Sequence, residues 1–444
     1  MSGSLRDYMA ALRARKQLLV VKKEVDPKFE LHAVVRKVQA GPNLPVLFEK
    51  VRGTRYPVVS NLLGNYGIVA EQLGADIGRL AEKWAALSRT NSFPDPLDTD
   101  AAPAVFDQIS LGDLPHLTFC EKDAGPYITA GVVLARDPDT GVVNLSFHRC
   151  QMIGNDELRC RLSTSGDLFR IQQKCEQRGQ PLPATIMLGL PPAIMLAGAT
   201  TVGPANSEYD LAARLLNRRI PIMKSPKHGL PIPASAQFVI EGEIAAGVRR
   251  PEGPFGEWMD YYVQQANNHV FEVQEVYAQK EAVFHAVGSG SNEELAISSI
   301  PIAGTIFNAV QTWVPNVADV TCFPLPQFCA IQLKNPAEGQ PQRAMLAAFG
   351  AEMSRVLYVV VVDDDVNIHN LQDVLWAMAT RCRPDKDIMQ IPNVPSFARD
   401  PHRVHWGRLG IDATRPINAA ADFERKKIPN LENVKLEDYL DRNS

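Results

Sequence analysis

Residues 249–262 read RRPEGPFGEWMDYY and place Glu252 and Glu257 at the two ends of a segment rich in glycine and proline. In regular structure these acids would diverge, because five residues are about 140° apart around a helix and point to opposite faces of a strand. A Gly-Pro-x-Gly segment can instead fold the chain back, since glycine reaches positive φ and proline presets a bend. We therefore expect a turn that brings both acids to one cavity.

Two carboxylates in one partly dry cavity have a distinct chemistry. They cannot both ionise freely, so one of them tends to hold a proton at neutral pH. That arrangement is typical of a proton donor and acceptor. The alternative is a surface turn with two solvated acids, which is the commoner outcome for an arbitrary pair of glutamates at this spacing. The aromatic residues that follow, such as Trp258 and Tyr261, favour the cavity.

Composition narrows the class of protein. The chain has 444 residues, of which 45% are hydrophobic and 22% charged, as in a soluble globular protein of roughly two to three domains. A net charge of -4 and a pI near 6.2 argue against a nucleic-acid partner. The N-terminus reads as a charged amphipathic helix, and we expect no membrane span. Seven cysteines without a C-x-x-C pair predict reduced thiols and a cytoplasmic location, with neither zinc nor disulfides.

The order of predicted elements divides the chain. Residues 1–104 alternate helix and strand, which predicts an N-terminal α/β domain that ends in a linker at 91–104. Residues 105–297 are dominated by short strands, which predicts a barrel or sandwich domain with one helix near 207–217. Residues 298–420 return to helix and strand, so we expect a C-terminal α/β domain. Within it, a continuous apolar run at 356–362 predicts a buried strand of a parallel sheet, and Asn370 is the predicted N-cap of a helix at 371–381. Residues 421–444 are charged and are predicted to form a tail or a docking helix.

Two further segments carry polar side chains in suggestive patterns. Along a strand at 143–149, VNLSFHR, the residues Asn144, Ser146 and His148 would share one face, with Arg149 on the other. Such a set indicates a polar cofactor pocket, although a half-exposed strand would show the same pattern. Glu208 follows a serine at a predicted helix start, where it acts either as a capping residue or, if turned inward, as a metal ligand.

Together, these segments resemble the UbiD family of reversible, non-oxidative decarboxylases, which use prenylated flavin mononucleotide (FMN). The family pattern N-x-S-x-x-R is matched by Asn144, Ser146 and Arg149, and its metal-binding glutamate falls on Glu208. Its E-G-P-F-G-E/D segment is matched residue for residue at 252–257. Similarity continues at 231–244, 362–381 and 407–416, so the likeness covers most of the chain.

The resemblance implies a role for each matched residue. Glu257 would be the acid/base that protonates the carbon left when carbon dioxide departs. Arg149 and Glu252 would form an ionic network with it and hold the substrate carboxylate. Asn144 and Glu208 would ligate a divalent ion, typically Mn²⁺, that anchors the cofactor phosphate in a pocket that Ser146 also lines. A monovalent cation such as K⁺ is a further candidate at this site.

The chain departs from the family pattern at one position. The family usually places a histidine, its third metal ligand, about eighteen residues after the arginine. Here Asp167 and Leu168 occupy that region, and no histidine lies between His148 and His228. The resemblance therefore leaves Asp167 or water to complete the coordination.

The resemblance also implies a fold, a function and partners. It implies a central split β-barrel of flavin-binding type between the two α/β domains, with the C-terminal domain forming a homodimer or higher homo-oligomer. The reaction would be decarboxylation, or the reverse carboxylation, of an aromatic, heteroaromatic or α,β-unsaturated carboxylic acid. A flavin prenyltransferase would supply the cofactor, and Trp258 and the segment around Ile302 are candidates to line the substrate pocket. The alternatives are a cofactor-binding protein of the same fold without decarboxylase activity, and a flavin oxidoreductase.

Overall fold

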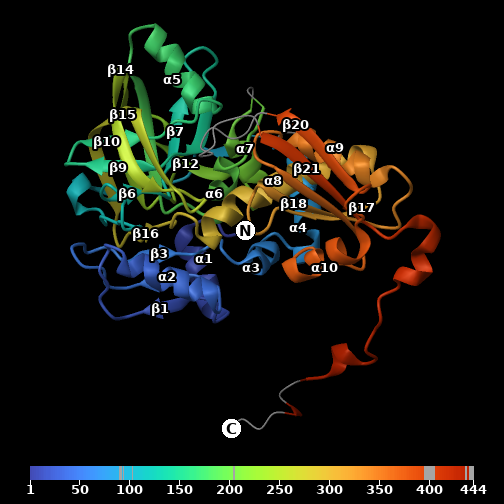
Figure 1. The fold of residues 1–444 in the computed structure, drawn as a ribbon. Helices are drawn as coiled ribbons and strands as arrows, with labels where there is room; N and C mark the ends of the chain where they lie inside the picture. Colours follow the sequence, from blue (N-terminus) through green and yellow to red (C-terminus); the bar gives the residue numbers. More distant parts are fainter. Residues whose placement is uncertain are drawn as a thin grey trace.

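The computed structural model describes residues 1–89, 93, 95–102, 104–203, 206–394, 406–435 and 438–439. Figure 1 shows three groups of elements: the N-terminal elements lie beneath the large central sheet, and the C-terminal elements lie to one side of both. The family-implied architecture of α/β, β-rich and α/β parts is therefore present. The domain boundaries at 104, 297 and 420 remain a prediction.

The N-terminal part alternates helix and strand, as its sequence predicts. Its elements are α1 (Leu5–Ala14), β1 (Leu19–Val21), α2 (Glu30–Ala40), β2 (Val46–Phe48), β3 (Val58–Ser60), α3 (Tyr66–Gln72) and α4 (Leu80–Arg89). The sheet runs in the order β1-β2-β3-β16, because β16 (Phe284–His285) returns from the central region to pair with β3. Helix α1 buries Leu5, Tyr8 and Leu12, which recur every three to four residues and so share one face.

The central part is built on a nine-stranded sheet with the order β6-β9-β10-β15-β14-β11-β7-β8, to which β5 adds at β15. The strands are β5 (Phe106–Ile109), β6 (Tyr127–Ile128), β7 (Val132–Arg136), β8 (Val143–Phe147), β9 (Cys150–Ile153), β10 (Glu157–Cys160), β11 (Leu182–Leu188), β14 (Phe238–Gly256) and β15 (Tyr262–Gln279). Their pairings are antiparallel. The order is an open path, so the described strands form a large antiparallel sheet and no closed barrel; the split barrel itself remains a prediction.

Shorter elements surround the central sheet. They are α5 (Asp167–Gln177), α6 (Pro192–Gly198), α7 (Glu208–Leu216) and a small sheet in the order β13-β12-β4, formed by β4 (Leu97–Asp98), β12 (Ile220–Lys224) and β13 (Pro231–Pro233). Helix α7 confirms the helix predicted near 207–217, with Ser207 as its N-cap. Strand β4 lies within the predicted linker at 91–104 and pairs with β12, so this segment contributes to the sheet structure.

The turn predicted between Glu252 and Glu257 is wrong. Residues up to Gly256 belong to β14, and the chain reverses only at 257–261, where the amide of Glu257 donates to the carbonyl of Tyr261. The register with β15 shifts on both sides of Glu252, and Gly253 has φ of 90°. These irregularities break the strict alternation of side chains along the strand. Glu252 and Glu257 can therefore approach the same positively charged side chain, although both lie close to the end of β14.

The C-terminal part is an α/β layer, as predicted. It contains α8 (Asn292–Trp313), β17 (Val317–Thr321), β18 (Phe328–Leu333), α9 (Gln340–Ala351), β19 (Tyr358–Asp363), α10 (Leu371–Arg381), β20 (Ile388–Val394) and β21 (Trp406–Ala413). The sheet order is β17-β18-β19-β21-β20. The predicted buried strand is confirmed in β19, which pairs in parallel on both sides. The predicted cap is also confirmed, since Asn370 accepts a hydrogen bond from the amide of Gln372.

Helix α8 joins the central and C-terminal parts. By length and composition alone it could cross a membrane, whereas no span was expected from the sequence, and 61% of its most apolar window is buried inside the molecule. It packs against α4, α9 and β17. These contacts are those of a core helix, in which apolar residues face the protein interior on most sides. Arg425 still pairs with Asp373 of α10, and beyond it the described chain extends away from the body (Figure 1).

Candidate active site

Arg149, between β8 and β9, holds the two acids of the 252–257 segment. Its Nε donates to Glu252 Oε1 at 2.9 Å and its Nη2 donates to Glu252 Oε2 at 2.8 Å. Its Nη1 forms an ion pair with Glu257 Oε1. The Arg149 side chain is only 7% exposed, and both glutamates are buried. The Arg149 guanidinium therefore forms a bidentate ion pair with Glu252 and a separate ion pair with Glu257.

Further groups, which sequence reasoning missed, hold this network in place. Asn268 Nδ2 donates to Glu252 Oε2 at 2.9 Å, and Asn268 is itself buried. The Arg149 guanidinium lies 4.8 Å from the centre of the Phe255 ring, and that ring packs against Tyr127. Burial, together with the negative charge of Glu252, raises the pKa of Tyr127. No spacing in the sequence links Asn268 or Tyr127 to Glu252, because the contacts arise from pairing in the sheet.

The segment that carries Glu257 is anchored from a loop far away in the sequence. Asp123 Oδ1 accepts a hydrogen bond from the amide of Gly256 at 2.8 Å, and its other oxygen accepts from the amide of Cys120. Gln151 Oε1 accepts from the amide of Gly253 at 3.1 Å. The contacts at Gly253 and Gly256 each satisfy a backbone donor that the irregular pairing of β14 leaves free. These hydrogen bonds to the amides of Gly253 and Gly256 thus fix the backbone that leads to Glu257.

A second polar cluster joins β8 to the start of α7. Asn144 Nδ2 donates to Glu208 Oε1 at 2.9 Å, and the amide of Leu145 donates to Glu208 Oε2 at 2.7 Å. Ser146 Oγ donates to Asn144 Oδ1 at 3.1 Å. Glu208 is turned inward, at 3% exposure, so it does more than cap a helix. Burial raises the pKa of Glu208 to about 7, against the opposing effect of the hydrogen bond from Leu145.

Asp167 lies at the start of α5 and lines the same cavity as Asn144 and Glu208. Its carboxylate forms an ion pair with Arg170 at 2.8 Å. Its negative charge adds to the effect of burial in raising the pKa of Glu208. Among the residues that the structure describes, no three His, Cys, Asp or Glu side chains gather as a metal-binding group. A cation here would have to use the Asn144 amide oxygen beside the two carboxylates.

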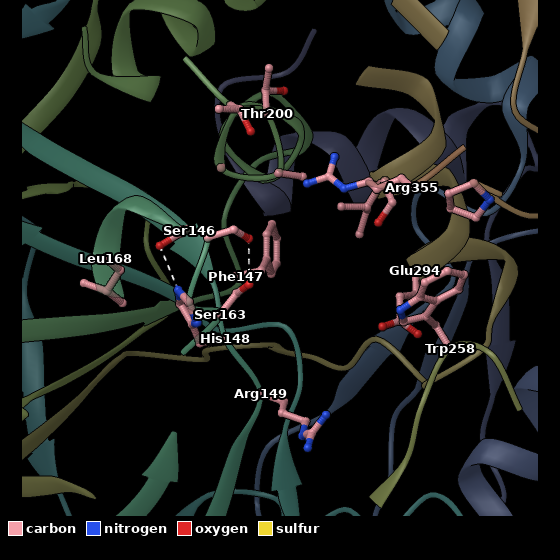
Figure 2. Close-up of a pocket in the computed structure, with 18 of the residues that line it drawn as sticks. Ser146, Phe147, His148, Arg149, Ser163, Leu168, Thr200, Trp258, Glu294 and Arg355 are labelled. Atoms are coloured by element: carbon pink, nitrogen blue, oxygen red, sulfur yellow. Dashed lines mark hydrogen bonds between the residues drawn. The ribbon is translucent and has the colours of Figure 1, made fainter. Parts of the chain in front are cut away.

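Both clusters face one cavity of about 390 Å³ between the central and C-terminal parts. Figure 2 shows Ser146 and His148 on one side of it, with Trp258, Glu294 and Arg355 on the other. Trp258 and Ile302 line this cavity, and their contact with the substrate remains a prediction. Other lining residues that the sequence did not single out are Thr200, Thr201, Glu294, Gln327 and Arg355. They lie on separate loops and helices, and only the packing of the C-terminal part against the central sheet brings them together.

Comparison with known proteins identifies the family. Residues 9–88 match the 3-octaprenyl-4-hydroxybenzoate carboxy-lyase N-terminal domain, residues 97–292 its Rift-related domain, and residues 296–413 its C-terminal domain. The chain belongs to the UbiD family. The chain is thus a carboxy-lyase of the UbiD family, and the predictions of family and enzyme class are confirmed.

Among curated UbiD relatives, the anhydromevalonate phosphate decarboxylase of Methanosarcina mazei is 32% identical over 431 residues, which cover 96% of this chain and 99% of that protein. The enzyme of the same name from Methanothermobacter thermautotrophicus is 30% identical over 420 residues, covering 92% and 97% of the two chains. Among solved structures, the UbiD-class enzyme HmfF from Pelotomaculum thermopropionicum in complex with FMN has a TM-score of 0.92 and 35% identity, covering 98% of this chain and all of HmfF. An evolved dimeric form of HmfF in complex with prenylated FMN (prFMN) has a TM-score of 0.89 and 36% identity, covering 99% and 100%.

Proposed function

We propose that this chain decarboxylates, or in reverse carboxylates, an α,β-unsaturated, aromatic or heteroaromatic carboxylic acid with prenylated FMN, and that Glu257 carries the proton. The observation that supports this most directly is the contact of one buried guanidinium, Arg149, with both Glu252 and Glu257 at the wall of the cavity. A carboxylate that loses its carbon dioxide needs a cation to orient it and one acid to protonate the carbon that remains. Both groups are present within one network.

The cavity fits a flat flavin with a phosphate tail. One end carries amide, hydroxyl and carboxylate oxygens from Asn144, Ser146, Thr200 and Glu208, and Arg355 also lines the cavity. These groups can bind a phosphate directly or through a cation, which the desolvation of a phosphate dianion requires. Apolar side chains that can pack on an aromatic ring complete the lining, among them Phe147, Leu168, Val287, Ile297, Ile302 and Leu357. When bound, prenylated FMN supplies an electron sink for the carbon that loses carbon dioxide.

The residues of the chain then have separate tasks. Arg149 binds the charge of the substrate carboxylate. Glu252 holds the Arg149 guanidinium in one orientation by accepting two hydrogen bonds from it, and Asn268 in turn donates one hydrogen bond to the Glu252 carboxylate. Glu257 delivers a proton to the carbon from which carbon dioxide has left. In the carboxylation direction the same carboxylate removes that proton. Burial of the three charged groups keeps water away from the reacting carbon.

The remaining proposals rest on the resemblance to UbiD enzymes. We propose that Asn144 and Glu208, with Asp167 or water, would hold a divalent ion, Mn²⁺ in the family pattern, which would offset the charge of the cofactor phosphate; K⁺ is a further candidate ion. We also propose a flavin prenyltransferase as the source of cofactor, a homodimer or higher homo-oligomer, and a cytoplasmic location. The relatives of the Methanosarcina type add phosphorylated α,β-unsaturated acids to the substrates to be tested.

The test is release of carbon dioxide by protein that has been produced together with a flavin prenyltransferase. The panel contains benzoic, furoic and acrylic acid derivatives and a phosphorylated α,β-unsaturated acid, with Glu257→Gln as the matched control. We expect at least one class to be turned over by the wild type and not by the control. Loaded protein that turns over none of them would support cofactor binding without decarboxylation, and hydride exchange with a nicotinamide would support a flavin oxidoreductase.

A further inference from the structure

Arg355 brings a positive charge to the cavity from the C-terminal part. It lies between α9 and β19 and lines the cavity together with Gln327 and Leu357. The backbone amide of Arg355 donates to the carbonyl of Glu352 at 3.2 Å. The amide of Leu357 donates to the carbonyl of Gln327 at 2.8 Å, so the chain is held on both sides of this position. Figure 2 shows Arg355 across the cavity from Ser146.

The guanidinium of Arg355 is less engaged by the protein than those of the other arginines that line the cavity. Arg149 is bound by two glutamates, and Arg170 forms an ion pair with Asp167 at 2.8 Å. Within the part of the chain that the structure describes, the Arg355 guanidinium donates no hydrogen bond, and its ion-pair partner is Glu352. A guanidinium carries five N–H donors in one plane. Arg355 can therefore bind an anion without giving up a hydrogen bond within the protein.

The ion pair with Glu352 is a weak one. Its Nη1 and Oε2 atoms are 3.7 Å apart, which is beyond hydrogen-bond distance, and the Arg355 side chain is 36% exposed, so water screens the pair. Burial raises the pKa of Glu352, and the charge of Arg355 opposes this only in part. Glu294, an acid on the same wall in Figure 2, accepts a hydrogen bond from the amide of Gly290 at 2.7 Å. An anionic ligand in the cavity can therefore replace Glu352 as the main partner of Arg355.

We propose that Arg355 binds a second anionic group of the substrate, a phosphate or a second carboxylate, and so makes the enzyme selective for acids that carry one. The proposal rests on the proposed function in one respect, namely that Arg149 holds the carboxylate that is lost. The cluster around Asn144 and Glu208 is the proposed partner of the cofactor phosphate, and Arg355 lies across the cavity from the strand that carries Asn144. The planar fork of arginine matches both phosphate and carboxylate, with two parallel hydrogen bonds.

Binding of matched acids to FMN-loaded, full-length protein tests this inference without turnover. One pair is crotonate and 4-phosphooxycrotonate, which differ by a phosphoryloxy group, and the other is benzoate and terephthalate, which differ by a carboxylate. Titration calorimetry gives the affinity for each acid. We expect the wild type to bind the doubly anionic acid of at least one pair about tenfold more tightly or better, as a charge-assisted hydrogen bond provides. Arg355→Gln should lose that preference, and Arg355→Lys should keep part of it, because lysine keeps the charge but not the fork.

Arg343→Gln is the matched control, because it removes the same charge from an exposed position of α9 that does not line the cavity. An equal loss of preference in this control would overturn the proposal, since net charge alone would then explain it. A wild type without preference in either pair would also overturn it, as would an unchanged preference in Arg355→Gln.

The cofactor phosphate is the other anion that Arg355 could bind in this cavity. Retention of FMN relative to riboflavin separates the two, because these flavins differ by that phosphate. A lower ratio of FMN to riboflavin retention in Arg355→Gln would assign the residue to the cofactor and overturn the proposal. None of these readouts uses carbon dioxide release. An enzyme that failed the decarboxylation test could thus still show the preference, and the two failures are distinguishable.

Discussion

The two glutamates that share Arg149 should respond differently to the same isosteric change. In Glu257→Gln, Arg149 keeps both of its hydrogen bonds to Glu252, at 2.9 and 2.8 Å, so the buried guanidinium stays paired. We expect the fold to survive, with a loss of about 1 kcal/mol in the free energy of unfolding for one neutralised contact. Turnover should fall by about 10²–10⁴, the usual contribution of a positioned acid or base. That range corresponds to about 2.7–5.4 kcal/mol of activation free energy.

In Glu252→Gln, the structural loss should dominate. Three donors point at the Glu252 carboxylate, two from Arg149 and one from Asn268. A glutamine amide must place its NH₂ group against at least one of them, which leaves buried donors facing each other. Removing one partner of a buried ion pair costs about 3–5 kcal/mol, and the remaining contact of Arg149 with Glu257 brings our expectation to the lower end, about 3 kcal/mol.

The assays are denaturant unfolding followed by circular dichroism, and carbon dioxide release by the loaded enzyme. Glu257→Asp serves as a further control, because it keeps the charge but shortens the side chain by one methylene. Turnover of Glu257→Gln within about fivefold of the wild type would refute the role of Glu257 as proton carrier, because a positioned acid supplies far more. Unfolding of Glu252→Gln at the same denaturant concentration as the wild type would show that Glu252 does not hold Arg149.

Three further predictions concern the backbone, a buried histidine and the cofactor end of the cavity. Gly253→Ala should destabilise the protein by about 2–4 kcal/mol in thermal or denaturant unfolding, because φ is 90° and the new Cβ would lie 2.8 Å from the carbonyl oxygen of Val263. At Gly247 φ is 70° but a new Cβ would meet no atom within 4 Å, so Gly247→Ala should cost only the backbone strain of about 1 kcal/mol. Equal losses of stability in the two variants would contradict a role for the contact with Val263. Burial lowers the pKa of His32 to about 4 from 6.5, so the folded state resists its protonation and stability is lost as pH falls from 6.5 towards 4. Between pH 7 and pH 5, His32→Gln should therefore lose about 2 kcal/mol less unfolding free energy than the wild type, and parallel losses would contradict this. Glu208→Ala should mainly reduce retention of flavin during gel filtration, and undiminished retention would remove Glu208 from the cofactor site.

Much of the fold followed from local pattern. The N-terminal helix α1 and the buried strand β19 were predicted because apolar residues recur with helical spacing or run continuously. The cap at Asn370 was predicted from the residue type, since an asparagine side chain accepts hydrogen bonds from backbone amides two or three residues later. Such features depend on neighbours in the sequence, so the sequence by itself determines them.

The hairpin of β14 and β15 shows where local pattern was insufficient. Glycine and proline between Glu252 and Glu257 predicted a turn, yet pairing with β15 extends β14 to Gly256. Hydrogen bonds from a partner strand and from Asp123 outweigh a local preference for bending. The convergence of the acids thus depends on contacts with residues far away along the chain.

The sequence alone identified the family, because Arg149, Glu252, Glu257, Asn144 and Glu208 stand in its characteristic spacing, and it singled out these five as the candidate site residues. Only the tertiary structure decided what surrounds them. Asn268 meets Glu252 through strand pairing, and Arg355 reaches the cavity because the C-terminal part packs against the central sheet. These neighbours are set by the packing of distant elements, which no local spacing encodes.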